Sequence, residues 1–402
     1  MYLTTSIAVL ITLVEQTELA EEPMATHVHL ICLAVQPLME TAPLPQMEPS
    51  ALMRLVDLWV LRLRGICAHQ RAHVARAMVI VEVHQIIVRQ HQGVKQLSEL
   101  VMIQAQREMG EDYCTSPDCQ FNYGPACDAN KIPSGTNTSS IQRNKVGSVL
   151  YGSAGIYDCV QAGDMALTFD DGPFIYTSHI LNLLQQYNAT ATFFITGNNN
   201  GQSFQQKRYV EEFTDDLLGK GEIDNTSLAW PALIKRMYSE GHQVASHTWS
   251  HPDLSNITSL QRKNEMWKNE MALRNILGVI PTYMRSPYSS CTAESGCEGD
   301  LNDLGYHITF FNLDTSDYLN DSPTLIQNSK NIFDAAVNSS NPSTDEFLVI
   351  AHDIHNQTSQ VLVEYMLQGL KAKDYKPVSV GTCLGDPMEN WYRTDTSATL
   401  GS

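Results

Sequence analysis

The chain has 402 residues, with 26 Lys and Arg against 44 Asp and Glu, and its formal net charge is −18. This length accommodates one large domain plus additional material, or two domains. Residues 1–110 carry 8 Lys and Arg and 10 Asp and Glu, so almost all of the excess negative charge belongs to residues 111–402. Such an acidic body argues against binding to nucleic-acid backbones, whereas neutral or cationic polymers remain suitable partners.

Residues 1–110 differ in composition from the rest of the chain. They contain no Asn and no Phe, whereas residues 111–402 contain 23 Asn and 11 Phe. Their apolar runs follow no clean period of two or 3.6 residues, so they are predicted not to form a well-ordered domain. The run at residues 6–14 resembles the apolar core of a signal peptide, although no Lys or Arg precedes it, and it is too short to span a bilayer. No transmembrane segment is expected.

The cysteines and the N-x-S/T sequons favour a secreted protein. Seven of the nine cysteines follow residue 110, and no C-x-x-C pair indicates a zinc ribbon or a redox motif. Cysteines available for disulfides, combined with several potential glycosylation sites, are typical of extracellular proteins. The seven sequons begin at Asn137, Asn188, Asn225, Asn256, Asn320, Asn338 and Asn356.

From about residue 150 onward, short apolar runs alternate with amphipathic segments. Strands that alternate with helices predict an α/β fold built on a parallel sheet or barrel. In such barrels the functional side chains lie where the strands end. The runs are DMALTF, ATATFFIT, HQVASH, TYMRS, HITFFNLD, EFLVIAH and KPVSV.

Three of the intervening segments carry helix signals. Residues 259–278 end in Gly278, a suitable C-cap residue. A second helix is predicted to start at Ser322 and Pro323, an N-cap residue followed by proline in the first turn. The third is predicted over residues 360–373.

Two histidines at one strand end are candidate metal ligands. His247 and His251 are four residues apart, and a helical turn would place both rings on one face, with about 6 Å between their Cβ atoms. Together with an aspartate from a neighbouring strand end, they form a set that suits Zn²⁺ or another divalent ion with open positions. The same set holds iron in non-haem oxygenases, so it does not by itself fix the reaction.

The adjacent Asp170 and Asp171 at the end of the first run have a role beside such a metal. One carboxylate can bind the ion while the other takes a proton from water, and the cation offsets their mutual repulsion. His352, at another strand end, can supply a proton to a leaving group. Oxygenases need no such base, so these residues favour a hydrolytic reaction.

The strand-end residues fall in five motifs, which are TFDDG, HTWSH, RSPY, DTSDY and IAH in chain order. In these motifs the chain resembles polysaccharide deacetylases of the NodB-homology type (carbohydrate esterase family four), and it is most similar to the fungal-type chitin deacetylases. The resemblance covers about residues 113–390. It implies a distorted (β/α) barrel with fewer than eight regular strands, a catalytic domain over residues 151–390 and a tail over residues 391–402.

The resemblance also implies the catalytic roles. Asp170 would be the general base and Arg285 would hold it in place. His352 would be the general acid, oriented and tuned by Asp314. The reaction would be hydrolysis of N-acetyl groups on N-acetylglucosamine units of chitin or chitooligosaccharides.

The resemblance further implies a divalent metal, with Zn²⁺ favoured and Co²⁺ as the alternative, bound by Asp171, His247 and His251. The backbone N–H of Tyr288 would bind the oxyanion. Tyr318 stands where the family often has Trp and would form an aromatic wall for the sugar. Ile350 stands where Leu is usual and would contact the acetyl methyl group. Two disulfides are implied, Cys159–Cys383 and Cys291–Cys297.

Two segments depart from the family pattern. Residues 202–219 resemble an insertion after a strand end, which is either a lid over the groove or an untranslated segment kept in the gene. Residues 113–130 resemble the end of a hevein-like chitin-binding module, and residues 111–150 are expected to be a linker. Because the rest of that module is missing, our hypothesis is that the preceding residues derive from a wrong frame or exon.

Other functions remain open at this point. The five motifs do not separate chitin from other acetylated polymers such as peptidoglycan or xylan. A non-catalytic carbohydrate-binding relative is disfavoured by the presence of Asp170 and His352, and an iron oxygenase by the same pair. We expect a monomeric, secreted enzyme acting at the cell wall.

Overall fold

The computed structural model describes residues 128–153, 155–199 and 221–395, all of which belong to one compact unit, Met109–Ser402. Three expectations lie outside the described residues and stay predictions. They concern the atypical segment 1–110, most of the hevein-like stretch 113–130 and the insertion 202–219.

Eight strands form the main sheet, and they are β1 (Asp164–Asp170), β2 (Thr192–Ile195), β5 (Gln243–Ser246), β7 (Tyr283–Met284), β8 (His307–Ile308), β9 (Leu313–Asp314), β10 (Phe347–His352) and β11 (Lys376–Val378). Their order is β8-β7-β5-β2-β1-β10-β9, with β11 also paired to β1, and all pairs are parallel. Among the described residues no pairing of β8 with β9 closes the sheet. The predicted distorted (β/α) barrel is therefore confirmed.

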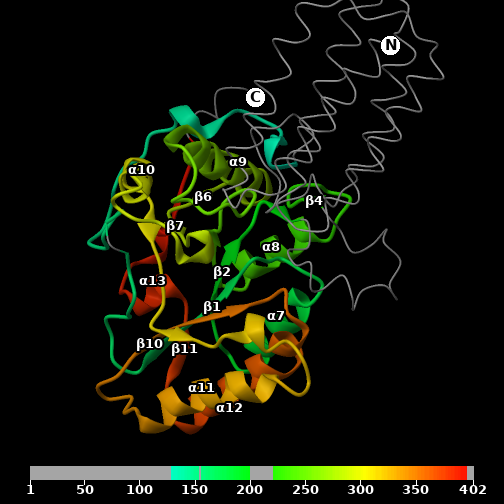
Figure 1. Ribbon diagram of the computed structural model, residues 1–402, viewed down its shortest axis with the longest axis vertical. Coiled ribbons are helices and arrows are strands. Elements are labelled where there is room, and N and C mark those ends of the chain that lie inside the picture. Colours follow the sequence, from blue (N-terminus) through cyan, green and yellow to red (C-terminus); the bar gives the residue numbers. More distant parts are fainter. Residues whose placement is uncertain (1–127, 154, 200–220, 396–402) are drawn as a thin grey trace, which may run out of the picture. The chain divides into compact units, whose positions relative to one another are not determined.

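Helices follow most of these strands. The α-helices are α7 (Thr177–Gln186), α8 (Trp230–Ser239), α9 (Ser259–Leu277), α10 (Cys297–Asp303), α11 (Ile326–Ser339), α12 (Val363–Ala372) and α13 (Val380–Cys383). Two small antiparallel pairs join β3 (Asn198–Asn199) to β4 (Gly221–Glu222) and β6 (Ile280–Pro281) to β12 (Tyr392–Arg393). Short helices are η2 (Asp128–Asn130), η3 (Thr138–Ser140), η5 (Pro287–Ser289), η6 (Asp317–Leu319), η8 (Met388–Asn390) and the π-helix η7 (Thr358–Leu362). Figure 1 shows α11 and α12 side by side, and the Tyr365 hydroxyl donates to Asp334 between them.

The helix signals in the sequence act as expected in two cases of three. In α9, Thr258 and Gln261 form a reciprocal capping box, and Gly278 ends the helix at φ 75°. The third predicted helix is present as η7 followed by α12. The second begins later than predicted, because Ser322 accepts the Leu325 N–H in a turn and α11 starts only at Ile326.

The sheet has apolar side chains on both faces, as expected for strands of a barrel. Successive residues of β1 alternate, so Leu167 and Phe169 pack toward the helices while Ala166, Thr168 and Asp170 point to the opposite, inner face. The inner face carries a cluster of apolar side chains, which are Ala166, Phe194, Ala245, Tyr283, Leu348, Val380, Cys383 and Trp391. Apolar packing thus fills part of the interior, next to the polar residues of β1.

Two expected boundaries need correction. Residues 128–150 are not a free linker, because Arg143 makes two bonds of 2.7 and 2.8 Å to Glu270 on α9. The domain also extends beyond residue 390. Trp391 is buried, β12 pairs with β6, and the Asp395 carboxylate lies 2.6 Å from the Arg274 guanidinium.

Both expected disulfides are present. Cys159–Cys383 joins the segment before β1 to α13, with a sequence separation of 224, and Cys291–Cys297 closes a loop with a separation of 6. Within the described residues, no helix is both long enough and apolar enough to cross a membrane.

The two disulfides should stabilise the domain unequally. In the chain-entropy account, loops with separations of 224 and 6 differ by about 3 kcal/mol in the stability that their cross-links supply. All four cysteines are buried, so the packing lost on replacement by Ala is comparable. We expect the Cys159→Ala/Cys383→Ala variant to have a much lower free energy of unfolding in urea than Cys291→Ala/Cys297→Ala. Equal losses would contradict this account.

Candidate active site

Asp170 and Asp171 project differently from the end of β1. Asp170 is the last residue of the buried strand and is 2% exposed. Asp171 has a left-handed backbone, with φ 74°, a conformation that Asp tolerates better than most residues. The next residue must be glycine, because a Cβ on Gly172 would lie 2.1 Å from a carboxylate oxygen of Asp353. The turn therefore separates the two carboxylates that the sequence places side by side.

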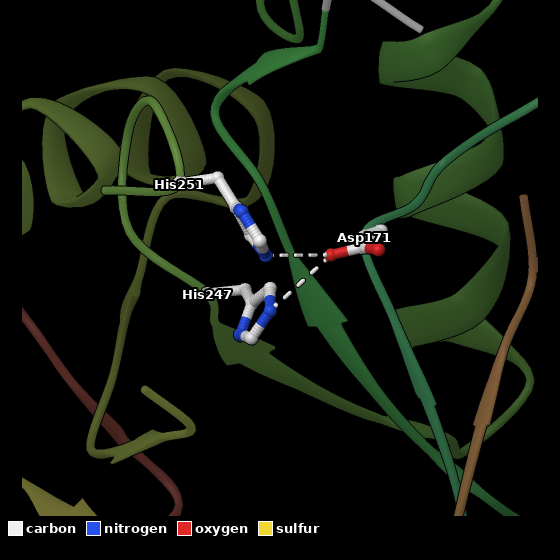
Figure 2. A group of neighbouring side chains, drawn as sticks. All are labelled: Asp171, His247 and His251. Carbon is white, nitrogen blue, oxygen red and sulfur yellow. Dashed lines mark ion pairs between the residues drawn. The ribbon is translucent and has the colours of Figure 1, made fainter. Parts of the chain in front are cut away.

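The Asp171 carboxylate points toward the rings of both His247 and His251 (Figure 2). Its Oδ1 atom is 3.3 Å from His247 Nε2 and 3.1 Å from His251 Nε2. All three residues are buried, and their potential ligand atoms lie within 4.8 Å of one another. The structure thus brings together the three residues that were predicted to bind a metal.

The protonation of His247 shows that this cluster suits a cation. His247 Nδ1 lies 2.8 Å from the Arg285 carbonyl oxygen, which can only accept, so Nδ1 carries the proton in the neutral ring. The Nε2 lone pair then faces the lone pairs of Asp171 Oδ1, an arrangement that a bound cation would stabilise. Ligand atoms of a tetrahedral Zn²⁺ site stand about 3.3 Å apart, close to the distances present. The residues therefore fit a divalent metal.

Electrostatics keep Asp171 in the form that binds metals. Burial by itself would raise the pKa of Asp171, but the neighbouring His251 and His247 outweigh it and hold that pKa well below its usual range. Burial lowers the pKa of His251, against the opposite effect of Asp171. The carboxylate is thus ionised, and the imidazole tends to the neutral form that can act as a ligand.

The two histidines are not brought together by a helical turn. Residues 247–251 form a loop, in which Thr248 has φ 72° and His251 has φ 60°. The rings nevertheless converge, with 4.9 Å between their centroids. The loop uses unusual backbone conformations, rather than helix periodicity, to bring them together.

Arg285 contacts Asp170 inside the barrel. Its Nη1 atom donates to Asp170 Oδ1 at 2.8 Å and to Thr168 Oγ1 at 2.6 Å, while Nε and Nη2 donate to the carbonyls of Thr309 and Phe310. The guanidinium also lies 4.3 Å from the centre of the Phe194 ring. Arg285 is only 1% exposed. Its charge is therefore compensated by one carboxylate whose orientation it fixes.

His352 has a different partner from the predicted one. Its Nδ1 lies 2.7 Å from Asp317 Oδ1, and its backbone N–H donates to Asp317 Oδ2 at 2.7 Å. Thr358 also donates to Asp317 Oδ2. Asp314, the predicted partner, instead accepts the N–H of Ser316. The role assigned to Asp314 thus falls to the second aspartate of DTSDY, because η6 turns Asp317 toward β10.

The His352–Asp317 pair favours the imidazolium. Burial by itself would lower the pKa of His352, but Asp317, together with Asp171 and Asp170, raises it to about 10. Burial likewise would raise the pKa of Asp317, yet His352 outweighs it and lowers that pKa. At neutral pH the ring therefore carries a proton that it can donate, as a general acid must.

Asp170 and His352 face each other across two neighbouring strands. They are register partners in the parallel pairing of β1 with β10. The Asp170 carboxylate is paired with the Arg285 guanidinium, and the His352 imidazole is paired with the Asp317 carboxylate. The candidate base and the candidate acid thus lie on adjacent strands, next to the Asp171, His247 and His251 cluster.

The three predicted substrate-contacting residues lie around this centre. The Tyr288 ring is 62% exposed and meets the His251 ring edge-on at 4.8 Å, and the Tyr318 ring is 44% exposed and meets the His352 ring at 5.4 Å. Ile350 is buried in β10, two residues before His352, so both point to the same face of the sheet. Two partly exposed aromatic rings therefore flank the polar centre.

Sequence reasoning missed two buried carboxylates besides Asp317. Asp353 follows His352 directly, and its carboxylate accepts the Thr177 hydroxyl at 2.5 Å behind the turn at Gly172. Glu265 lies in α9 and accepts the N–H of Ser250 at 2.7 Å. Asp353 and Asp317 stood inside the IAHD and DTSDY stretches and could have been suspected there, but no pattern in the sequence marks Glu265.

Titration of His352 shows whether Asp317 or Asp314 is the aspartate that raises its pKa. Asp317→Asn removes the charge that raises the pKa of His352, so we expect that pKa to fall by at least about one unit. Asp314→Asn should leave it unchanged. NMR titration of metal-free, histidine-labelled protein measures both values, with His352→Gln identifying the resonance. A lower pKa of His352 in Asp314→Asn alone would restore Asp314 as the partner of His352.

Comparisons with known proteins agree with this geometry. The polysaccharide deacetylase profile matches residues 158–323. The chain is 39% identical over 271 residues to the chitin deacetylase of Colletotrichum lindemuthianum, which covers 67% of this chain and 97% of the relative. The solved structure of the chitin deacetylase from that fungal pathogen matches with a TM-score of 0.53 and 40% identity, over 61% of this chain and 97% of that one.

A second kind of relative has a different name. A probable peptidoglycan-N-acetylglucosamine deacetylase of Arthroderma benhamiae is 35% identical over 243 residues, which are 60% of this chain and 48% of the relative. Since this chain covers nearly all of the 39% identical fungal relative and contains the matching domain, it belongs to the polysaccharide deacetylase family and is a hydrolase of amide bonds.

Proposed function

We propose that the protein hydrolyses the N-acetyl groups of chitin or chitooligosaccharides, which releases acetate and leaves glucosamine units. The observation that carries this proposal is the pairing of Asp170 with His352 on adjacent strands, each bound to a charged partner beside a metal-type cluster. The similarity to a fungal chitin deacetylase supports chitin as the polymer.

The metal would be held by Asp171, His247 and His251, with Zn²⁺ favoured and Co²⁺ as the alternative. A divalent ion with open positions supplies Lewis-acid polarisation of the acetyl carbonyl and lowers the pKa of water. The chain contributes the ionised Asp171 carboxylate and the His247 tautomer fixed by the Arg285 carbonyl. These two features make the site ready for a cation before substrate arrives.

Proton transfers are assigned to two side chains. Asp170, oriented by Arg285, accepts a proton from the water whose oxygen forms the new bond to the acetyl carbon. His352, kept protonated by Asp317, donates its proton to the sugar nitrogen as the carbon–nitrogen bond breaks. Acetate and an amine result, so atoms and charge balance. The Tyr288 N–H is proposed to stabilise the developing oxyanion.

The surroundings of the centre suit a sugar polymer. The exposed rings of Tyr288 and Tyr318 flank it, and aromatic rings offer apolar faces to the C–H groups of sugars. Two disulfides support an extracytoplasmic location, since such bonds persist in oxidising compartments. We therefore propose a secreted enzyme that acts as a monomer on chitin in the cell wall.

Acetate release tests the substrate and the metal together. We expect the full chain to release acetate from chitin oligomers, to lose this activity after chelation and to regain it with Zn²⁺ or Co²⁺. Acetylated xylan and peptidoglycan serve as competing substrates. Faster release from peptidoglycan would favour the alternative suggested by the Arthroderma relative, and no release from any polymer would support a non-catalytic binding role.

The base can be tested with two variants of the same strand. Asp170→Asn keeps the size of the side chain but cannot accept the proton, so we expect kcat to fall by about 10²- to 10⁴-fold while metal binding persists. Asp164→Asn, at the other end of β1, is the matched control and should keep its activity. Full activity in Asp170→Asn would end the assignment of the base.

A further inference from the structure

Glu265 is a buried carboxylate that the catalytic steps above do not use. It lies in the second turn of α9 and is only 1% exposed. No lysine, arginine or histidine in the described ranges lies within 4 Å as an ion-pair partner. A buried carboxylate without such a partner is costly unless hydrogen bonds compensate for its lost hydration.

The compensating donors come from the loop between His247 and His251. The Ser250 N–H donates to Glu265 Oε2 at 2.7 Å, and the Ser250 hydroxyl donates to Oε1 at 2.9 Å. Both oxygens of Glu265 therefore bind the backbone and side chain directly before His251.

The two histidines are held in different ways. The ring of His247 is fixed by its own Nδ1 hydrogen bond to the Arg285 carbonyl. The Nδ1 of His251 has no hydrogen-bond partner among the described residues, and its ring meets only the Tyr288 edge and the neighbouring His247 ring as aromatic contacts. Apart from Asp171, which lies 3.1 Å from its Nε2 atom, the position of the His251 ring therefore depends on its backbone.

That backbone is in an uncommon conformation. Thr248 and His251 both have positive φ, and the His251 N–H is satisfied locally by the Thr248 hydroxyl at 3.0 Å. Positive φ is unfavourable for residues other than glycine, most for a β-branched one such as Thr, and persists only where surrounding contacts impose it. Glu265 supplies such contacts between the two strained residues.

We propose that Glu265 is a positioning residue that sets the affinity of the site for its metal by holding the Ser250 backbone, and through it His251. The inference rests on the proposed metal site and concerns a residue that does not touch the metal. Partners of this kind behind metal ligands typically change metal affinity by about 10- to 100-fold when replaced. Glu265 thus does for His251, through the backbone, what the Arg285 carbonyl does for His247 directly.

The same helix offers a matched control. Glu270 is also fully buried in α9, but it binds Arg143 and the Tyr306 hydroxyl, away from the histidine loop. Replacement of either glutamate by Gln turns one buried acceptor oxygen into an NH2 donor and leaves a bound N–H or O–H group without its acceptor. Both variants should lose thermal stability, so only an effect specific to the metal site separates the two positions.

The experiment measures Co²⁺ and Zn²⁺ binding to metal-free full-length protein, by competition with a chromophoric chelator and by the visible absorption of bound Co²⁺. We expect Glu265→Gln to weaken binding by about 10- to 100-fold and to alter the Co²⁺ spectrum. Glu270→Gln should bind as the unaltered protein does. Ser250→Ala removes only the hydroxyl donor and should weaken metal binding by a smaller factor. This variant replaces Glu265→Gln in the experiment if Glu265→Gln does not fold.

Three outcomes overturn the inference. Unaltered affinity and spectrum in both Glu265→Gln and Ser250→Ala would exclude a positioning role. Equal losses in Glu265→Gln and Glu270→Gln would show a general effect of stability. Failure of the unaltered protein to bind either ion would overturn the proposed metal site together with this inference. Normal metal binding without acetate release would instead overturn the proposed function and leave this inference standing.

Discussion

The buried guanidinium of Arg285 is the contact on which the rest of the site depends. Its donors bind the Asp170 carboxylate and the Thr168 hydroxyl on β1, and the carbonyls of Thr309 and Phe310 on a second segment. The backbone carbonyl of Arg285 fixes the tautomer of His247. A single residue thus orients the proposed base and prepares a metal ligand. Because both residues are buried, loss of the Arg285 side chain would leave the Asp170 carboxylate without its ion-pair partner.

Charges around the site are arranged as pairs with distinct tasks. Arg285 keeps Asp170 in place, Asp317 raises the pKa of His352 to about 10, and the histidines keep Asp171 ionised. The parallel sheet makes this possible, since the carboxyl ends of its strands converge at one edge. Strands hold the proposed acid and base, and two of the proposed metal ligands, Asp171 and His251, have positive φ values in loops.

Much of this could be predicted from the sequence, because apolar runs mark strands and polar residues that end such runs must meet at one edge. Three details could not. The turn between His247 and His251 depends on the hydrogen bond from Ser250 to Glu265 in α9, which is fifteen residues further along the chain. The choice of Asp317 over Asp314 depends on the path of η6. Residues 391–395 belong to the domain because of tertiary contacts with β6 and Arg274. Each is decided by long-range packing, which local pattern does not encode.

The register of β1 with β10 has a consequence for how such an enzyme can change. Asp170 and His352 are register partners on neighbouring strands, which stand about 4.8 Å apart in a sheet. Backbone hydrogen bonds therefore set the separation between the Cα atoms of the proposed base and the proposed acid. A reacting group must fit that separation whatever polymer carries it. Evolution is therefore free to alter the loops bearing Tyr288 and Tyr318, and with them the choice of polymer, while the chemistry stays constant.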